Sequence, residues 1–350
     1  MGKLKKLTGY RLFLPLSCLI IVLLINLITT PTFFRITINN GVLYGYIIDV
    51  INRASELVVL AVGMTLVVSA SAGTDISVGA VMAVAAAVCT RVLAGGEVSV
   101  NEYANPYVLA VLAALAAAVV CGGFNGFLVA KLKIQPMVAT LILFTAGRGI
   151  SQLVTNGQIT YIRVDGYKLL GNNIPGIPIP TPIFVAVIVV ALTYILLKKT
   201  AMGMYIQSVG INERASRLVG LKSVKIIWMA YAFCGLCAGI AGLVASSRIY
   251  SADANNIGLN MELDAIAAVA LGGNSLGGGR FSLLGSVIGA YTIQALTTTL
   301  YAMSVPSDQI PVYKAIVVIL IVAVQSEELR KLKKRMMAKH TSKTVEGGAA

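Results

Sequence analysis

The sequence predicts an all-α polytopic membrane protein with about ten transmembrane helices, broken helices among them, and two similar halves. Its 350 residues are 57% hydrophobic and only 12% charged, with a mean hydropathy of +0.85. Soluble domains carry about 25% charged residues, so this composition is typical of a membrane protein. Repeated apolar runs approach the ~20 residues that cross a bilayer core. No long soluble stretch separates these runs, so residues 1–350 are expected to form a single integral membrane domain.

The apolar runs define ten candidate spans. They are residues 12–30, 57–72, 77–93, 107–130, 137–154, 182–197, 226–246, 263–273, 281–301 and 310–324. At about 1.5 Å of rise per residue the eighth run is too short to cross the membrane alone, so it is a candidate half-helix. The first run is followed by no small-residue cleavage pattern and is interpreted as an uncleaved span. Residues 36–52 mix asparagine and aspartate with apolar residues and are expected to lie at the membrane interface.

Basic residues predict the orientation of the spans, because cytoplasmic loops of membrane proteins are enriched in lysine and arginine. With the N-terminus inside, most of the 28 basic residues fall on cytoplasmic segments. This predicts a cytoplasmic N-terminus at 1–11, a transmembrane core at 12–324 with a cytoplasmic loop at 198–225, and a basic cytoplasmic tail at 325–350. The net charge of +14 then reflects topology and contact with membrane lipid, and no nucleic acid partner is expected.

One carboxyl group interrupts the apolar stretch 57–90. Asp75 is its only ionisable side chain apart from a cysteine thiol, and it stands in the glycine-flanked segment 73–79. A carboxyl group at membrane depth costs at least about 2.5 kcal/mol and normally faces a partner or a water-filled passage. Irregular backbone at that depth needs similar cover. We therefore predict a helix break on a translocation pathway; a plain turn between two spans is the alternative.

The predicted pathway residues come from this break and from the fifth span and its approach. They are Thr74, Asp75, Ser77, Gln135 and Arg148. Because a buried carboxyl group is stabilised by a basic or amide partner, Gln135 or Arg148 is the expected partner of Asp75.

A second glycine-rich segment stands before the ninth span. Residues 271–280 read LGGNSLGGGR and precede a helix of small residues, as segment 73–79 does. This echo indicates two halves with broken helices at matching places, as in repeat transporters. Four glycines of this loop are expected to have a structural role: Gly272, Gly273, Gly277 and Gly278. Its spacing resembles a phosphate-binding loop, but no Lys-Ser/Thr pair follows, so nucleotide binding is excluded there.

Catalytic and metal chemistry are excluded by the residue types present. The five cysteines lie in apolar runs, and Cys234 and Cys237 have no second pair or histidine to complete a metal site. The only histidine, His340, lies in the basic tail, which excludes zinc and Ser-His-Asp chemistry. We expect a chain that is not an enzyme and that holds no metal or cofactor.

The cytoplasmic loop 198–225 contains a predicted short amphipathic helix. Asn212 can cap this helix, Glu213 suits the positive end of its dipole, and Gly220 suits its C-terminus. Three apolar residues between them give the helix one apolar side. A helix of this kind on the cytoplasmic face is a docking element for a partner protein. A loop helix that lies on the membrane surface is the alternative.

Three motifs resemble those of one known family. Residues 64–84, MTLVVSASAGTDISVGAVMAV, resemble the glycine-aspartate-serine signature of bacterial sugar ABC permeases of the ribose type. Residues 200–222 are similar to the cytoplasmic coupling loop of that family, and residues 262–290 to its C-terminal signature. Residues 133–149 and 251–266 most resemble the galactofuranose-importer permeases. The Gly-Thr-Asp sequence at 73–75 departs from the family's Gly-Gly-Ile-Asp, which alters the register of this loop.

The resemblance implies the membrane-spanning permease subunit of an ABC importer in the bacterial cytoplasmic (inner) membrane. Its substrate would be a ribose- or galactofuranose-like monosaccharide. Two separate ATP-binding subunits would dock on the cytoplasmic face, an extracytoplasmic sugar-binding protein would deliver the sugar, and a second permease copy, in a homodimer or heterodimer, would complete the pathway. The resemblance assigns coupling to the ATPase to Asn212, Glu213, Arg214 and Gly220.

Two other classes of membrane protein remain open at this stage. An ion-coupled secondary transporter of a small polar solute would suit broken helices and the intramembrane Asp75. The small number of charges in the spans argues against it. A scaffold without transport activity, or a channel-like membrane protein, is the third possibility. The sequence leaves open which sugar is carried and in which ring form.

Overall fold

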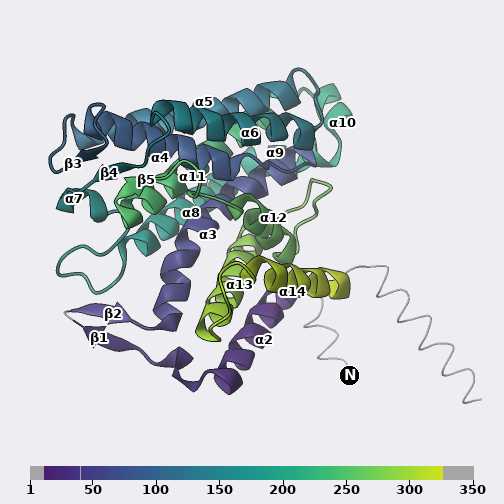
Figure 1. Ribbon diagram of the computed structural model, residues 1–350. Coiled ribbons are helices and arrows are strands. Elements are labelled where there is room, and N and C mark those ends of the chain that lie inside the picture. The colour runs from purple at the N-terminus through teal and green to yellow at the C-terminus, as the bar shows by residue number, and fades with distance from the viewer. Residues whose placement is uncertain (1–11, 40, 326–350) are drawn as a thin grey trace, which may run out of the picture.

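The computed structural model describes residues 12–39 and 41–325, which are mostly helical (Figure 1). The predicted N-terminal segment 1–11 and the tail from residue 326 onward, with His340, lie outside the described residues. The described helices are α2 Phe13–Thr29, η1 Pro31–Phe34, α3 Tyr46–Ser71, α4 Val78–Ala94, α5 Tyr107–Ala130, α6 Pro136–Val154, α7 Asp165–Lys168, α8 Thr181–Lys199, α9 Met202–Ile211, α10 Glu213–Leu218, α11 Ser223–Ile249, α12 Met261–Leu271, α13 Leu283–Ala302 and α14 Ile310–Gln325.

Short strands gather the loops at one end of the helix bundle. They are β1 Thr37–Asn39, β2 Val42–Tyr44, β3 Ser99–Val100, β4 Thr160–Ile162 and β5 Ser251–Ala252. The first two form an antiparallel hairpin; the other three form a sheet in the order β3-β4-β5, with β3 parallel and β5 antiparallel to β4. Since β3, β4 and β5 follow α4, α6 and α11, the C-terminal ends of these helices meet there. Figure 1 shows this end at the left and α10 at the opposite end.

The prediction of a mostly helical protein with several membrane spans is confirmed. Among the described residues six helices are long and apolar enough to cross a membrane: α3, α5, α6, α8, α11 and α13. Shorter apolar helices lie within α2, α4 and α14. Helix α12 has 11 residues, about 16 Å at the usual rise, and is too short to cross a bilayer core alone.

The segment predicted to lie at the membrane interface, residues 36–52, is helical from Tyr46 onward, and its place at the interface stays a prediction. Helix α3 begins at Tyr46 and continues for 26 residues without interruption. Asp49 is exposed in the first turn, where a carboxylate complements the helix dipole, and Glu56 forms an ion pair with Arg248 of α11. Glu56 thus has a tertiary partner that the sequence pattern cannot reveal.

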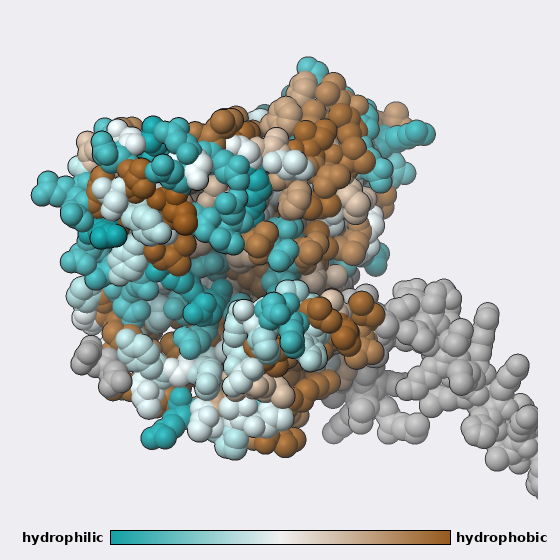
Figure 2. Space-filling view, in the orientation of Figure 1, coloured by the Kyte–Doolittle hydropathy of each residue, from teal (hydrophilic) through white to brown (hydrophobic). Residues whose placement is uncertain are grey.

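Helix α3 lies at the centre of the bundle and α5, α6 and α8 at its periphery. In its apolar window 89% of α3 is buried, against 22% of α8. Helices α5 and α11 approach closely because Gly122 has no side chain; a Cβ there would overlap the carbonyl oxygen of Tyr231. Figure 2 shows hydrophobic side chains gathered over the upper right, where α5 and α6 lie, and hydrophilic ones at the end that carries β3 and α7.

Candidate functional site

The break predicted around Asp75 lies between α3 and α4. Helix α3 ends where Ala72 adopts a left-handed conformation with φ 53°, and α4 begins at Val78. The start of α6 covers the intervening backbone: a Cβ on Gly73 would overlap the ring of Pro136. Irregular backbone at membrane depth requires such protein cover.

One oxygen of Asp75 organises this break. Asp75 is 2% exposed, and its Oδ1 accepts hydrogen bonds from the backbone N–H of Ser77 (2.9 Å), the hydroxyl of Ser77 (2.6 Å) and the side-chain amide of Asn125 (3.3 Å). The same Asn125 amide donates to the Ser77 hydroxyl at 2.8 Å. Asn125 was missed by the sequence reasoning, although it is the one carboxamide side chain in α5 and stands alone in an apolar run.

The expected pairing of Asp75 with Gln135 or Arg148 is wrong. Gln135 is exposed at the N-cap position of α6. Besides Pro136, Thr140 of α6 lies beside the break, and its hydroxyl accepts the backbone N–H of Ile76 at 3.2 Å. Arg148 lies eight residues further along α6, about 12 Å away. The structure therefore brings Asp75 and its neighbour residues together but leaves both expected partners elsewhere.

Thr74 and Ser77 are both buried beside Asp75. The carbonyl oxygen of Thr74 lies 3.5 Å from the Thr140 hydroxyl, and the Thr74 hydroxyl has no hydrogen-bond partner within the described residues. Ser77 is the N-cap residue of α4. The break is thus held by hydrogen bonds from α4, α5 and α6.

A second break between α12 and α13 repeats this local geometry. Asn274 Oδ1 accepts the backbone N–H of Ser282, the N-cap residue of α13, as Asp75 Oδ1 accepts that of Ser77. The Asn274 amide donates to Ser286 at 2.8 Å, and the Ser286 hydroxyl lies 2.6 Å from that of Thr65 on α3. Both breaks therefore fix the start of the following helix through an Asp or Asn side chain.

The four glycines predicted to be structural have different environments. A Cβ on Gly272 would overlap the backbone of Gly285, so only glycine allows α12 to reach the first turn of α13. Gly273 and Gly278 adopt positive φ angles of 76° and 85°, which favour glycine. Gly277 is exposed, and nothing near it requires glycine.

Gly210 of α9 forms the junction between the predicted coupling segment and both breaks. A Cβ at this position would overlap the carbonyl oxygen of Ser69, two residues before the end of α3, and would lie 2.6 Å from the backbone nitrogen of Gly279. That nitrogen donates to the same Ser69 oxygen at 2.9 Å. Helix α9, which the sequence reasoning left unassigned, therefore contacts the segment leading into the first break and the loop of the second.

The predicted short helix is α10. Asn212 caps it by accepting the backbone N–H of Ala215 at 3.0 Å, and Gly220 follows it with a φ of 87°. Glu213 pairs with Arg217 of the same helix and with Lys133 in the α5–α6 loop. Partial burial of Glu213 disfavours its ionised form, but the charges and hydrogen bonds of Lys133 and Arg217 outweigh this, so the pKa of Glu213 is lowered.

The apolar side of α10 faces outward. Leu218 is 89% exposed and Val219 78%, and Ile211 at the end of α9 is also exposed. Arg214 is exposed too, and forms no ion pair within residues 12–39 and 41–325. An exposed apolar cluster with a free guanidinium is suited to contact a partner protein.

A polar cavity of about 490 Å³ lies at the opposite end, bordered by α3, α11, α12 and α13. Two ion pairs border it: Arg248 with Glu56 at 3.0 Å, and Asp264 with Lys314 of α14 at 2.7 Å. Its further polar lining residues are Arg53, Asp253, Asn256, Gln294, Thr297 and Tyr301. Asp264 and Lys314 are charges within predicted spans, and only the fold shows that Asp264 borders a cavity.

Arg148 lies near this polar end, apart from the first break. Its guanidinium donates to the carbonyl oxygens of Ala254 (3.0 Å) and Ile257 in the loop before α12. The buried Glu262 is near enough to interact with it electrostatically. A Cβ on Gly79 would overlap Glu262 Oε2, so this glycine admits the carboxyl group beside α4.

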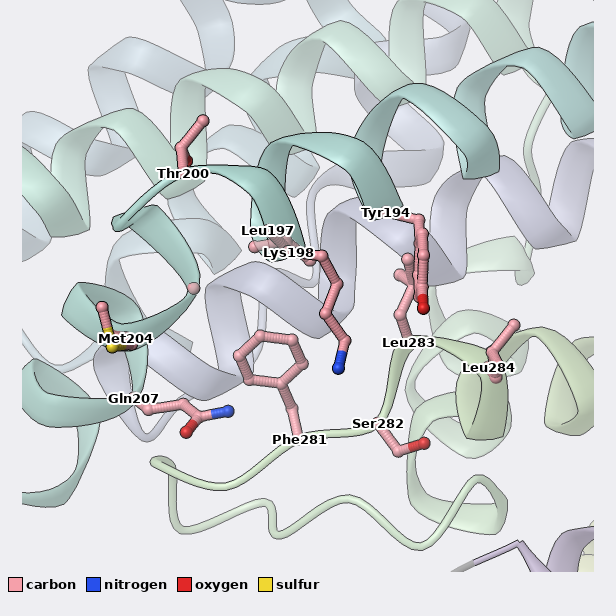
Figure 3. A pocket seen from close by; sticks show the side chains of 11 residues that line it. Tyr194, Leu197, Lys198, Thr200, Met204, Gln207, Phe281, Ser282, Leu283 and Leu284 are labelled. Carbon is pink, nitrogen blue, oxygen red and sulfur yellow. The ribbon is translucent and has the colours of Figure 1, made fainter.

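A second cavity, of about 540 Å³, separates α8 and α9 from the segment that enters α13. Figure 3 shows Lys198 of α8 and Gln207 of α9 directed toward Phe281. Helix α9 is therefore tightly packed at Gly210 but open on its α13 side. These features together describe a bundle with two hydrogen-bonded breaks, a polar cavity at one end and an exposed helix at the other.

Comparison with known proteins agrees with a transport protein. Residues 46–325 match the family model described as branched-chain amino acid transport system / permease component. The galactofuranose transporter permease protein YtfT of Escherichia coli (strain K12) is 45% identical over 312 residues, 89% of each chain. The fructose import permease protein FruF of Bifidobacterium longum is 38% identical over 97% of this chain and 94% of its own.

The ribose import permease protein RbsC of Escherichia coli (strain K12) is 35% identical over 89% of this chain and 93% of its own. No solved structure matches the chain. Since the family model covers most of the sequence and several relatives match nearly from end to end, the chain belongs to the bacterial transport permeases of the branched-chain amino acid transport system / permease component family.

Proposed function

We propose that this chain is the membrane-spanning permease subunit of an ABC importer that carries a monosaccharide into the cytoplasm. The 45% identity to a galactofuranose permease carries the proposal, and the fructose and ribose permeases agree with it. The family description names branched-chain amino acids, whose side chains are apolar. The polar cavity is compatible with a polyhydroxylated solute, because carboxylate and amide groups hydrogen-bond to hydroxyls.

The proposed topology has ten passes in the bacterial inner membrane, with both termini cytoplasmic. The gathering of the loops after α4, α6 and α11 at one end supports the relative sides of these spans. The basic residues support the assignment of the α10 end to the cytoplasm. In this arrangement α12 and the following glycine loop together make one pass, and the two hydrogen-bonded breaks occupy matching places in two similar halves.

The chain itself would hydrolyse no ATP. Two separate ATP-binding subunits would contact the exposed α10, with Asn212 and Gly220 defining the helix and Arg214 offering a charge to the partner. A sugar-binding protein would deliver substrate at the polar-cavity end. A second permease copy would complete the pathway, and the exposed faces of the peripheral helices offer surface for it.

The contacts at Gly210 suggest how the nucleotide state reaches the pathway. Movement of α10 and α9 would displace Ser69 and Gly279 together, because the backbone of Gly210 on α9 contacts the backbones of both residues. Ser69 leads into the Asp75 break and Gly279 into the Asn274 break, so both breaks would change with the ATPase. Nucleotide binding can shift an equilibrium between two conformations only if it favours one of them. We propose that the junction of Gly210, Ser69 and Gly279 is the part of the fold that changes between two such conformations.

Co-purification tests the proposal directly. An affinity-tagged chain extracted from its native membrane should bring with it an ATP-binding subunit. The sugar-binding protein that delivers substrate to it should gain thermal stability with one of a panel of monosaccharides, pyranose and furanose forms included, and none with leucine or valine. Recovery without any ATPase, together with uptake that follows an ion gradient, would instead support the ion-coupled transporter.

A further inference from the structure

An apolar pocket bordered by three lysines lies between the α10-side ends of α5 and α11. We call it the lysine pocket; it is lined by Gly126, Phe127, Ala130, Lys131, Lys222, Val224, Lys225 and Trp228, and its volume is about 310 Å³. The two helices meet closely here, because a Cβ on Gly126 would lie 3.0 Å from the Trp228 Cα. The pocket therefore has a rigid floor formed by helix backbones and aromatic rings.

The charge at the rim of the pocket is uncompensated. Within residues 12–39 and 41–325, none of Lys131, Lys222 and Lys225 forms an ion pair. No acidic residue lines the pocket. The carboxylate of Glu213, whose backbone lies near the start of α11, is already held by Lys133 and Arg217. The lysines border an apolar pocket, so an anion at its mouth would meet the charge of their side chains and no lining carboxylate.

The pocket also lies where a phospholipid headgroup would be. Helix α5 is a peripheral span with a mostly exposed apolar surface, and the pocket is at its C-terminal end, beside α10 in Figure 1. Trp228 and Phe127 are 42% and 40% exposed, so their rings face the surroundings of the bundle. Tryptophan is enriched at the level of the headgroups, and basic pockets between spans bind acidic headgroups.

We propose that the lysine pocket binds one anionic phospholipid. Its phosphate lies between Lys131, Lys222 and Lys225, and the first carbons of an acyl chain lie against Trp228 and Phe127. Charge complementarity favours an anionic over a zwitterionic lipid, and the apolar floor favours a lipid over free phosphate. This inference goes beyond transport and does not depend on which solute is carried.

The only tryptophan of the chain lines the pocket, so its fluorescence reports occupancy. The full-length chain is reconstituted in nanodiscs that contain either brominated phosphatidylglycerol in phosphatidylcholine or brominated phosphatidylcholine in phosphatidylglycerol. We expect brominated phosphatidylglycerol to quench Trp228 at low mole fraction, with saturation. Brominated phosphatidylcholine should quench weakly and in proportion to its amount.

Substitution of the lysines separates headgroup binding from general lipid contact. Each lysine near an anionic headgroup contributes about fivefold in affinity, so Lys131→Gln, Lys222→Gln and Lys225→Gln together should abolish the preference for phosphatidylglycerol. A matched control is Lys198→Gln with Lys199→Gln, at the α10-side end of α8. Lys198 borders the cavity beside α9, and neither lysine lines the lysine pocket. Unchanged melting temperatures would show that all variants fold.

Three outcomes of the nanodisc experiment would overturn the proposal, and two further measurements could also do so. The three outcomes are equal quenching by the two brominated lipids, a preference that survives the triple substitution, and a preference that the control pair abolishes. In the assembled importer, the Trp228→Phe variant gives the fluorescence of the partner subunits alone. Loss of Trp228 quenching when ATPase subunits bind would assign the pocket to the ATPase interface instead. Inorganic phosphate that displaces the lipid at millimolar concentration would reduce the site to a free-anion site.

Discussion

Asp75 Oδ1 accepts hydrogen bonds from two groups of Ser77 and from the Asn125 amide, so the break needs an acceptor at this position. A hydrogen-bond acceptor and a charge are different requirements, and substitution can separate them. The sequence identified Asp75 because a lone carboxyl group in an apolar run is conspicuous. It could not identify the partner, because the pairing depends on how α4, α5 and α6 pack rather than on spacing.

Substitutions at Asp75 should therefore differ in stability according to whether the new side chain has a hydrogen-bond acceptor. Asp75→Asn keeps an oxygen that can accept the same three hydrogen bonds, so its melting temperature should stay close to that of the unmodified chain. Asp75→Leu leaves the buried Ser77 N–H unsatisfied, and Asn125→Leu removes the amide donor; each should lower stability by about 1–3 kcal/mol. Thermal unfolding in detergent measures this. Equal stability of Asp75→Leu and Asp75→Asn would contradict the assigned role of the acceptor.

Glu213 should be dispensable for folding but not for coupling. Its ion pairs are partly exposed, so Glu213→Ala should cost less than about 1 kcal/mol. Without the link to Lys133, α10 loses its tie to the α5–α6 loop, and substrate-stimulated ATPase activity of the assembled importer should fall. Glu213→Gln, which keeps the size of the side chain, is the control for charge. Normal coupling in both variants would make α10 a plain surface connector.

The pH dependence of this link follows from the lowered pKa of Glu213. A carboxylate whose pKa is lowered on folding contributes stability above its unfolded pKa and loses it as the pH falls through the folded value. The contribution of Glu213 should therefore be constant around neutral pH and disappear only in acid. Unfolding of the Glu213→Gln variant compared with the unmodified chain at pH 7 and pH 3 measures this; a larger difference at pH 3 would have the wrong sign.

Helix boundaries in this chain were predictable where composition changes sharply and not where polar residues find partners. The span at 107–130 coincides with α5, and the cap residues of α10 lie where the sequence indicated. Helix α3 begins at Tyr46, 11 residues before the span predicted at 57–72, because asparagine and aspartate at 36–52 gave that stretch the composition of an interfacial segment. Helix α9 was not predicted; it buries Ile206 and Val209 in the core and meets Ser69 and Gly279 through the backbone of Gly210, contacts that depend on the fold.

That backbone contact gives a prediction at the level of the element. Gly210→Ala should force α9 away from Ser69 and Gly279, at a cost of about 1–3 kcal/mol for overpacking, and should uncouple ATP hydrolysis from transport. Gly149→Ala on α6 is the matched control, because a Cβ there meets nothing within 4 Å and alanine is the better helix former. A Gly210→Ala importer with normal uptake per ATP would show that motion does not pass through this junction.

At the scale of the molecule, the arrangement of loops at two ends of the bundle makes topology testable. The sequence predicted the spans and their sides, but the sheet of β3, β4 and β5 depends on residues far apart in the chain. In a cysteine-free background, Ile177→Cys should react with an impermeant maleimide on intact cells. Leu218→Cys, 89% exposed on α10, should react only after permeabilisation. The reverse pattern would invert the orientation and remove α10 from the ATPase side.

Reconstituted transport tests the central claim most directly. The permease, its ATP-binding subunits and its sugar-binding protein are assembled in proteoliposomes, and uptake of a radiolabelled monosaccharide is measured with leucine as the competing solute. The proposed function predicts uptake that requires ATP and the binding protein, is unaffected by leucine, and is lost in the Gly210→Ala importer but kept in the Gly149→Ala importer. Uptake of leucine in place of the sugar, or sugar uptake that follows an ion gradient without ATP, would contradict it.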